Sequence, residues 1–348
     1  MSKIHSIGII GGGQLGSMMC QAAKKLRIKT VVISNDKYGT AQNYCDEFIY
    51  TDYNDEDNLK KFVDLVDMVT YEFENIPYDV LNKIEKHKIV LPNPKINQIV
   101  QNRKLEKEFI KELGIKTTSW VFIKEKKDIE KNKNLLPGIL KSCTLGYDGH
   151  GQYILNDMKD VENSWCFTDN YILEKLVNLK KEISVIITRF KNGDHSIYEP
   201  FENIHKNQIL KNSKIPSEIS KKIYEESINN AKIIADKLDY VGTMCVEYFI
   251  DDNENLLVNE IAPRVHNSGH LTINAFNISQ FENHIRAVCD LENVQIKKNF
   301  NAEMINILGN DIKIYRKKYF KKNEFFFDYL KKEIKDKRKM GHLTILKY

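Results

Sequence analysis

Short apolar runs and stretches of helical spacing alternate along the first hundred residues of the chain. The predicted elements are strands over 6–10, 29–34 and 67–73 and helices over 14–26 and 58–65. Alternation of this kind is typical of a parallel sheet with helices on both faces. Pro92 and Pro94 then interrupt the pattern, so we place the end of this first module at residue 98.

The rest of the chain continues as a mixture of helices and strands. One helical pattern covers 96–113 and ends at Gly114 as a C-cap, and a long amphipathic one covers 217–238 behind Pro216 as a helix start. Further apolar runs predict strands over 120–123, 138–141, 171–177, 182–188, 243–250, 256–261 and 304–308. A chain of 348 residues is long enough for two or three packed modules, and we expect a mixed α/β fold.

The composition is that of an ordinary soluble globular protein, with 42% hydrophobic and 29% charged residues and a net charge of +5. No apolar run approaches the roughly 18 residues of a membrane span, and no basic stripe is interleaved with aromatic residues as in nucleic-acid-binding proteins. The chain leads straight into the strand at 6–10 instead of a secretory signal. The six cysteines are scattered without a CxxC pair, which disfavours a zinc or disulfide framework and favours a cytoplasmic location.

The first candidate for chemistry is the glycine loop at 11–16, GGGQLG, followed twenty residues later by Asp36. It fits the dinucleotide fingerprint, in which a tight strand-to-helix turn presents backbone N–H groups to a phosphate. By itself the loop is compatible with a dinucleotide, with another phosphate ligand, or with tight packing alone.

A second candidate joins a lysine to a glycine-rich loop. Lys141 ends an apolar strand, and 144–152 reads TLGYDGHGQ. Three glycines in six residues allow backbone amides to close over phosphates, and the lysine supplies a fixed cation. The spacing is not that of a Walker A loop. A purely structural hairpin accounts for the glycines but not for the lysine.

The third candidate is a pair of acidic residues on a predicted hairpin. The strands over 243–250 and 256–261 are joined by a turn, and with Asn253 and Glu254 central, Glu247 lies directly opposite Glu260. Like charges at paired positions are unfavourable unless a divalent cation lies between them. The hairpin therefore predicts a magnesium site, to which the neighbouring Asn259 can add an oxygen. The alternative is a pair of solvated glutamates.

The fourth candidate is the polar loop that follows this hairpin. Residues 262–270 read APRVHNSGH and supply Arg, His, Asn and Ser side chains in close succession. Such residues are suited to binding anions and to forming several hydrogen bonds. The alternative is a loop whose polarity is structural.

Taken in order, these motifs resemble the ATP-grasp enzymes, and within them the 5-(carboxyamino)imidazole ribonucleotide synthases of purine biosynthesis. The stretches that carry the resemblance are GGGQLG (11–16), TYEFENIP (70–77), GYDGHGQ (146–152), VEYF (246–249), VNEIAPRVHNSGH (258–270) and RKMGH (338–342). The resemblance implies an ATP-grasp fold in three parts: a Rossmann-like pre-ATP-grasp domain at 1–98, an ATP-grasp domain at 99–295 with a lid at about 117–178, and a small β-rich domain at 296–348.

The resemblance also implies a set of site residues. Those for ATP are Arg103, Lys141, Gly146, Tyr147, Asp148, Gly149, His150, Gly151, Gln152, Glu174, Lys175, Leu176, Val177, Glu182, His205, Asn259 and Glu260. Those for the ribonucleotide are Gln14, Leu15, Glu72, Arg264, His266, Asn267, Ser268, Lys331, Arg338 and Lys339. Glu247 and Glu260 would bind Mg²⁺, with two ions expected. The catalytic residues would be Tyr147, Asp148, His150, Arg264 and Lys339.

The implied reaction is phosphoryl transfer from ATP to bicarbonate, which gives carboxyphosphate, followed by carboxylation of aminoimidazole ribonucleotide directly or through trapped CO₂. Asp148 is the hypothesised group for the amine proton, and Tyr147 for orienting the intermediate. A glycine-hinged lid would protect carboxyphosphate from water. A homodimer is expected, with small-molecule substrates and with neither nucleic acid nor membrane as a partner.

The chain departs from the family pattern at three places. His150 stands where arginine is usual, Lys337 replaces a glycine before RKMGH, and the sequence stops at Tyr348, which we expect to trim the last domain and alter the dimer contact. Of the alternatives, a formate-dependent glycinamide ribonucleotide transformylase would carry Glu at Gln14 and Asp-Thr-Gly at 267–269. A nicotinamide-dependent dehydrogenase would explain only the first glycine loop, and a non-catalytic binding protein would not need the intact lysines and glutamates.

Overall fold

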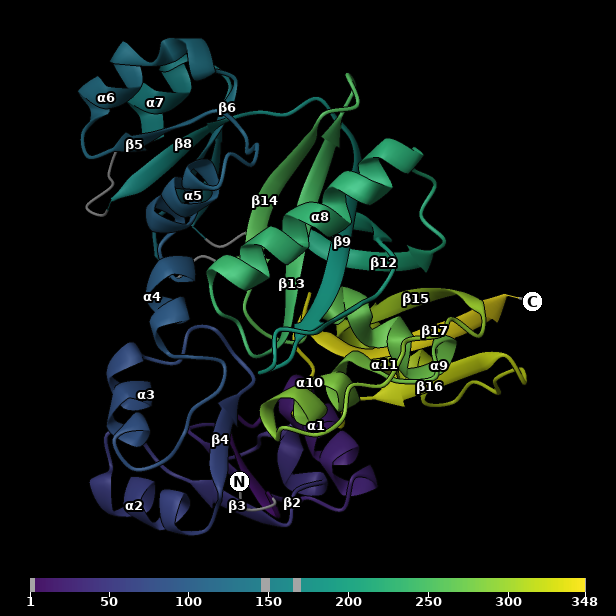
Figure 1. The fold of residues 1–348 in the computed structure, drawn as a ribbon. Coiled ribbons are helices and arrows are strands. Elements are labelled where there is room, and N and C mark those ends of the chain that lie inside the picture. Colours follow the sequence, from purple (N-terminus) through teal and green to yellow (C-terminus); the bar gives the residue numbers. More distant parts are fainter. Residues whose placement is uncertain (1–3, 145–150, 165–169, 348) are drawn as a thin grey trace.

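The computed structural model describes residues 4–144, 151–164 and 170–347, which form three sheets and their covering helices (Figure 1). The first sheet is parallel, in the order β3-β2-β1-β4, as the alternation of strand and helix predicts. Its elements are β1 (Ser6–Ile10), α1 (Gln14–Lys25), β2 (Lys29–Ser34), β3 (Glu47–Tyr50), α2 (Glu56–Asp64), β4 (Met68–Tyr71) and α3 (Tyr78–Glu85). The strand predicted over 67–73 is shorter than expected and ends at Tyr71, and the next residue, Glu72, directs its carboxylate to the glycine loop.

The second sheet is antiparallel, in the order β5-β8-β6-β7, and lies at the end of the molecule farthest from the first sheet (Figure 1). Its elements are β5 (Trp120–Ile123), α6 (Lys126–Lys131), β6 (Gly138–Ser142), β7 (Gln152–Leu155), α7 (Met158–Ser164) and β8 (Tyr171–Lys175). β6 carries Lys141 and the neighbouring β8 carries Glu174, and these two predicted site residues form an ion pair between the two strands.

The third sheet has nine strands in the described residues and contains the predicted hairpin. Its order is β14-β13-β9-β11-β12-β15-β17-β16, with β10 paired to β9. The bounds are β9 (Leu179–Arg189), β10 (His195–Ile197), β11 (Phe201–Lys206), β12 (Ile209–Ile215), β13 (Gly242–Asp251), β14 (Leu256–Ala262), β15 (Asn301–Leu308), β16 (Glu324–Asp328) and β17 (Lys339–Lys347). The pairing of β12 with β15 makes the C-terminal strands a continuation of the central sheet. The residue boundaries of the three domains stay a prediction.

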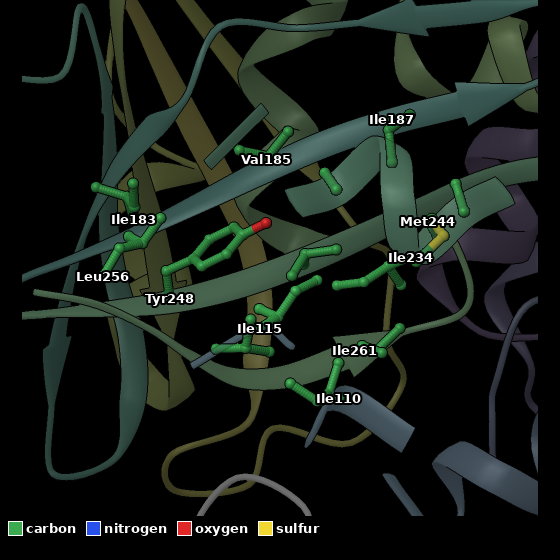
Figure 2. Packing of buried hydrophobic residues seen from close by; sticks show 14 of the residues in the cluster. Ile110, Ile115, Ile183, Val185, Ile187, Ile234, Met244, Tyr248, Leu256 and Ile261 are labelled. Atoms are coloured by element: carbon green, nitrogen blue, oxygen red, sulfur yellow. The ribbon is translucent and has the colours of Figure 1, made fainter. Parts of the chain in front are cut away.

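One face of β13, β14 and β9 packs on α8 (Lys221–Lys237) and forms the largest core (Figure 2). Met244, Val246, Tyr248 and Ile250 point into this core at every second position of β13. Glu247, which lies between them, therefore points to the opposite face. The remaining helices are α9 (Thr272–Ala275), α10 (Gln280–Val288), which packs on α1, and α11 (Ile312–Tyr315). No helix in the described residues could span a lipid bilayer.

Two predicted helices are corrected by the structure. The pattern over 96–113 is not one helix but two, α4 (Lys95–Val100) and α5 (Arg103–Glu112). The break comes at Asn102, whose side chain accepts hydrogen bonds from the Lys104 and Leu105 N–H groups and caps α5. The helix predicted from 217 begins at Lys221, because Ser220 caps it and Pro216 lies outside it.

The hairpin confirms the pairing of Glu247 with Glu260 but corrects the turn. Ile250 pairs with Leu256 and not with Leu257, as a turn with Asn253 and Glu254 at its centre would require, so the register next to the turn differs by one residue from the prediction. A β-bulge between the pairs Glu247–Glu260 and Tyr248–Val258 leaves one extra residue, Asn259, on β14. The bulge reverses the alternation of side chains on β14, which turns Glu260 away from the core face.

Candidate active site

A single cavity of about 1050 Å³ lies where the three sheets meet. Most of the predicted site residues that the structure describes line it. They are Gln14, Leu15, Glu72, Arg103, Lys141, Gln152, Glu174, Lys175, Leu176, Val177, Glu182, His205, Glu247, Asn259, Glu260, Arg264, His266, Asn267, Lys331, Arg338 and Lys339. The residues predicted to bind ATP and those predicted to bind the ribonucleotide are far apart in the chain. In the structure, both sets line the same cavity.

The other predicted residues do not line this cavity or cannot be placed. Gly146, Tyr147, Asp148, Gly149 and His150 lie outside the described residues. Gly151, in a left-handed conformation with φ +71°, packs against Ser142 beside the loop but does not line the cavity. Ser268 is fully buried behind it.

A buried ion-pair network holds Lys141 at the part of the cavity where the ATP contacts were predicted. The Lys141 ammonium donates to Glu174 Oε2 at 2.9 Å, and the Lys107 ammonium lies 3.3 Å from Glu174 Oε1. Burial by itself raises the pKa of Glu174, but the two ammonium groups outweigh it and hold that pKa well below its usual range. The Glu174 carboxylate, predicted to contact ATP, is therefore engaged in fixing Lys141.

Lys107 is a site residue that sequence analysis missed. Its side chain is only 2% exposed, and its ammonium donates to Thr117 Oγ1 at 2.7 Å and to the Asn259 carbonyl at 3.1 Å. It thereby joins the second sheet, through Glu174, to the bulge on β14. The only sequence signal is its place one turn after Arg103, and many other lysines have similar local surroundings.

The two hairpin carboxylates each pair with a basic side chain. Glu247 Oε1 lies 2.8 Å from His266 Nε2, and Glu260 Oε2 lies 3.4 Å from Arg103 Nη1. Burial alone raises the pKa of Glu247, but the His266 imidazole beside it lowers that pKa and keeps the carboxylate ionised. Beside them, Asn259 Oδ1 is buried without a hydrogen-bond partner in the described structure. Two carboxylates and an unsatisfied amide oxygen form an oxygen-rich set that a hard divalent cation would satisfy.

Glu106 is a second residue that sequence analysis missed. It lies on α5 behind Glu260, and its Oε1 accepts a hydrogen bond from the Ile261 N–H at 2.6 Å. Burial, together with the Glu260 charge, raises the pKa of Glu106 to about 7. Glu106 therefore anchors β14 just after the bulge.

The first glycine loop is occupied by a side chain of its own module. Both oxygens of the Glu72 carboxylate accept hydrogen bonds from backbone amides, one from Gly13 and one from Gly16. Burial raises the pKa of Glu72. Because these amides are the groups that would hold a pyrophosphate, the structure removes the basis of the dinucleotide interpretation.

Arg264 is fixed by a partner from the first module. Its Nε and Nη2 both donate to the Glu74 carboxylate, and its Nη1 donates to the Val265 carbonyl at 3.2 Å. A bidentate pair of this kind sets the plane of the guanidinium. Glu74 was missed, although the stretch TYEFENIP that contains it carried part of the resemblance.

The part of the cavity where the ribonucleotide contacts were predicted is rich in basic side chains from the segment before β17. Lys331 donates to Gln14 Oε1 at 2.7 Å and to the Lys339 carbonyl at 2.6 Å, which joins the C-terminal strands to the first module. Lys337 also lines the cavity and has φ +61°, a left-handed conformation that favours glycine.

On neighbouring strands of the third sheet, His205 of β11 and Glu182 of β9 form a close pair. His205 Nδ1 lies 2.5 Å from Glu182 Oε2. Although burial lowers the pKa of His205, the Glu182 carboxylate raises it above the ordinary value. This pair lines the cavity near the backbone of 175–177, where the adenine and ribose contacts were predicted.

Models of three protein families match consecutive parts of the chain. They are the Ribonucleotide synthetase preATP-grasp domain over 4–101, the ATP-grasp domain over 108–281 and the Phosphoribosylaminoimidazole carboxylase C-terminal domain over 302–348. The N5-carboxyaminoimidazole ribonucleotide synthase of Bacillus subtilis (strain 168) is 38% identical over 346 residues, covering 98% of this chain and 91% of that protein. The protein of the same name from Staphylococcus aureus (strain COL) is 40% identical over 351 residues, covering 98% and 92%.

Solved structures agree with these matches. An ADP complex of an N5-carboxyaminoimidazole ribonucleotide synthetase has a TM-score of 0.95 at 37% identity, covering 100% of this chain and 94% of that one. The Aspergillus clavatus N5-carboxyaminoimidazole synthase in complex with ADP and 5-aminoimidazole ribonucleotide has a TM-score of 0.91 at 26% identity, covering 100% and 95%. The predicted ATP-grasp fold is confirmed, and the chain belongs to the ATP-grasp family, in the group of the N5-carboxyaminoimidazole ribonucleotide synthases.

Proposed function

We propose that this protein is an ATP-dependent carbon–nitrogen ligase that carboxylates 5-aminoimidazole ribonucleotide with bicarbonate, giving 5-(carboxyamino)imidazole ribonucleotide, ADP and phosphate in purine biosynthesis. The observation that carries the proposal is the common cavity, which joins Lys141 and the Glu247–Glu260 pair to Gln14 and Lys331. One space can therefore hold a nucleoside triphosphate and a phosphorylated nucleotide with their reacting groups toward each other.

In this scheme, Lys141 and Arg103 offset the charge of the ATP phosphates. Their positions are set before the nucleotide binds, because Glu174 holds the first and Glu260 contacts the second. Such preorganised charge is the main means by which enzymes accelerate phosphoryl transfer.

Magnesium is part of the proposal, and the residues present fit it. Glu247, Glu260 and the unsatisfied Asn259 Oδ1 would hold it, with the predicted two ions completed by phosphate oxygens and water. The metal would neutralise charge on the β- and γ-phosphates.

The chemistry that follows needs a dry site. Transfer of the γ-phosphoryl group to bicarbonate gives carboxyphosphate and ADP; the exocyclic amine then attacks the carboxyl carbon, phosphate leaves, and the amine loses a proton. We propose that Arg264, held by Glu74, lies over the reacting carboxylate, and that Lys331, Arg338 and Lys339 bind the ribonucleotide phosphate. The roles of Asp148 in accepting the amine proton and of Tyr147 in orienting the intermediate stay predictions, as do the homodimer and the cytoplasmic location.

The test is release of ADP in the presence of 5-aminoimidazole ribonucleotide and bicarbonate, with each omitted in turn. We expect coupled turnover only when both are present; turnover only with glycinamide ribonucleotide and formate would overturn the proposal. Glu260→Ala should abolish turnover, because it removes half of the paired carboxylates. Glu254→Ala, at the exposed turn of the same hairpin, should retain turnover and serves as the control.

A further inference from the structure

Next to the hairpin carboxylates, Glu247 belongs to a cluster that includes a thiol, Cys245, which the ligase reaction does not use. Cys245, Glu247 and His266 each offer one ligand atom, and the three atoms lie within 4.8 Å of one another. Cys245 and Glu247 are two residues apart on β13, so their side chains point from the same face of the strand. His266 approaches from the loop after β14. The cluster therefore combines a thiol, a carboxylate and an imidazole.

The positions of these groups suit a metal that enters from the cavity. Glu247 and His266 line the cavity, and their side chains are each 12% exposed, whereas Cys245 is fully buried behind them. A metal bound by all three would keep one coordination position open toward the cavity. Three protein ligands and one open position make up the usual tetrahedral arrangement of a non-structural zinc site.

The imidazole also has an orienting partner. His266 Nδ1 lies 2.9 Å from Ser268 Oγ, and the Ser268 hydroxyl is itself fixed 2.8 Å from Ser184 Oγ. Metal-binding histidines almost always direct their second ring nitrogen to such a group. In this structure Nδ1 also accepts a hydrogen bond from the Ser268 N–H at 3.3 Å, and a metal on Nε2 would replace that contact by donation from a protonated Nδ1 to Ser268 Oγ. This serine was predicted to bind substrate, but its contacts fit a supporting role.

The ligand types decide which metal is favoured. Thiolate and imidazole select Zn²⁺ over Mg²⁺, which prefers carboxylates, water and phosphate. Mg²⁺ can use Glu247 without Cys245, but Zn²⁺ would use both. Zn²⁺ and Mg²⁺ would therefore compete for the Glu247 carboxylate.

We propose that Cys245, Glu247 and His266 form a Zn²⁺ site, and that bound Zn²⁺ inhibits the enzyme by taking Glu247 from the magnesium site. Zn²⁺ replaces the thiol proton, which leaves to solvent, and no oxidation is involved. The inhibition rests on the proposed ligase function, whereas the binding of the metal does not. The two claims can therefore be tested separately.

Binding is tested on the purified full chain with Co²⁺ as a spectroscopic substitute for Zn²⁺. We expect a thiolate-to-cobalt charge-transfer absorption band, and we expect added Zn²⁺ to abolish it by displacing Co²⁺. Cys245→Ala should lose this band, and Ser268→Ala should bind Co²⁺ about 10- to 100-fold more weakly. Cys289→Ala, at another buried cysteine at the end of α10, should keep the band. Circular dichroism of each variant checks that it is folded.

Inhibition is tested by adding Zn²⁺ to the ADP-release assay at saturating Mg²⁺. The wild type and Cys289→Ala should be inhibited, with recovery on chelation, and Cys245→Ala should keep its turnover. The absence of a thiolate band in the wild type, or a band that survives in Cys245→Ala, would overturn the site. Equal inhibition of all three proteins would overturn the mechanism of inhibition. Absent turnover without Zn²⁺ would contradict the ligase function and leave the cobalt result standing.

Discussion

Lys107 holds two walls of the cavity together without lining the cavity itself. Its buried ammonium contacts Glu174 on β8 and the Asn259 carbonyl on the bulge of β14. Lys107→Met keeps the length of the side chain but leaves part of the Glu174 charge uncompensated. Removal of one member of a buried ion pair costs about 3–5 kcal/mol. We therefore expect a loss of this order in the free energy of unfolding, measured in urea, and weaker ATP binding by calorimetry.

The matched control lies on the same helix. Lys104 is 37% exposed and pairs with Glu108 at 3.6 Å, so Lys104→Met should change the free energy of unfolding by less than about 1 kcal/mol. A stable Lys107→Met variant with normal ATP affinity would show that the network does not position Lys141.

Glu106 gives a prediction about pH. Its pKa is raised from 4.5 to about 7 in the folded protein by burial and by Glu260. Between these values the unfolded chain releases its proton first, so the free energy of unfolding falls as pH rises, by about 3 kcal/mol in total. Glu106→Gln keeps an acceptor for the Ile261 N–H but does not titrate. The free energy of unfolding, measured with urea in magnesium-free buffer, should fall between pH 4.5 and 7 by this amount more in the wild type than in Glu106→Gln. The same pH dependence in both proteins would contradict the prediction.

These residues also show what the sequence could not reveal. The sequence identified Lys141, Glu247 and Glu260 because each lies in a local pattern, namely a strand end before glycines and a hairpin. Lys107, Glu106 and Glu74 have no such pattern, since their function depends on partners about 70 to 190 residues away. What marks these charged side chains as important is their burial, and burial depends on the tertiary structure.

At the scale of elements, the pairing of Glu247 with Glu260 was predicted correctly, although the register next to the turn and the bulge on β14 were not. Next to the turn the register differs by one residue from the prediction, and the extra residue Asn259 shifts it back, so the two departures cancel at Glu247 and Glu260. Turn residues could be recognised from Asp251 to Asn255, but a bulge has no comparable sequence signature without glycine. The bulge aims Glu260 at the cavity, and Asn259 Oδ1 beside it has no hydrogen-bond partner among the residues that the structure describes.

The turn before β17 provides a prediction at the same scale. Lys337 lines the cavity beside several other basic side chains and has a left-handed backbone conformation. This conformation costs a non-glycine residue about 1 kcal/mol or more. Lys337→Gly should therefore leave thermal stability unchanged or slightly higher. It should also raise the KM for the ribonucleotide up to roughly fivefold, the equivalent of about 1 kcal/mol for an exposed charge contact. The KM for ATP should not change.

Arg27 is the matched control for this prediction, because it is exposed, has φ +59° and does not line the cavity. Arg27→Gly should relieve the same backbone strain with both KM values unchanged. An unchanged ribonucleotide KM in Lys337→Gly would show that the lysine is not a substrate contact.

At the scale of the whole molecule, the parallel first sheet and the order of elements could be predicted, because they follow from local periodicity. The continuation of the central sheet through β12 and β15 could not, since it depends on pairing between segments about 90 residues apart. This pairing is what brings Lys331 and Lys339 over the first module. The cavity is therefore a product of the assembly of all three parts.

The Arg264–Glu74 pair joins the first module to the loop that follows the hairpin. Glu74→Ala leaves a buried guanidinium without its bidentate partner, which we expect to lower the free energy of unfolding by about 3–5 kcal/mol. The more specific effect is on coupling, because Arg264 would lose its fixed plane over the reacting carboxylate while Lys141 and the hairpin carboxylates stay in place. ATP should then still be cleaved, with more of the carboxyphosphate lost to water.

The measurement is the ratio of ADP released to ribonucleotide carboxylated. This ratio should be close to one in the wild type and should rise in Glu74→Ala, and Glu74→Gln, which retains one acceptor for the guanidinium, should give an intermediate value. Glu85→Ala, at an exposed position at the end of α3, controls for loss of a charge in the same module. A Glu74→Ala enzyme that loses ADP release and carboxylation in equal proportion would place Arg264 in phosphoryl transfer, because only a role after ATP cleavage separates the two rates.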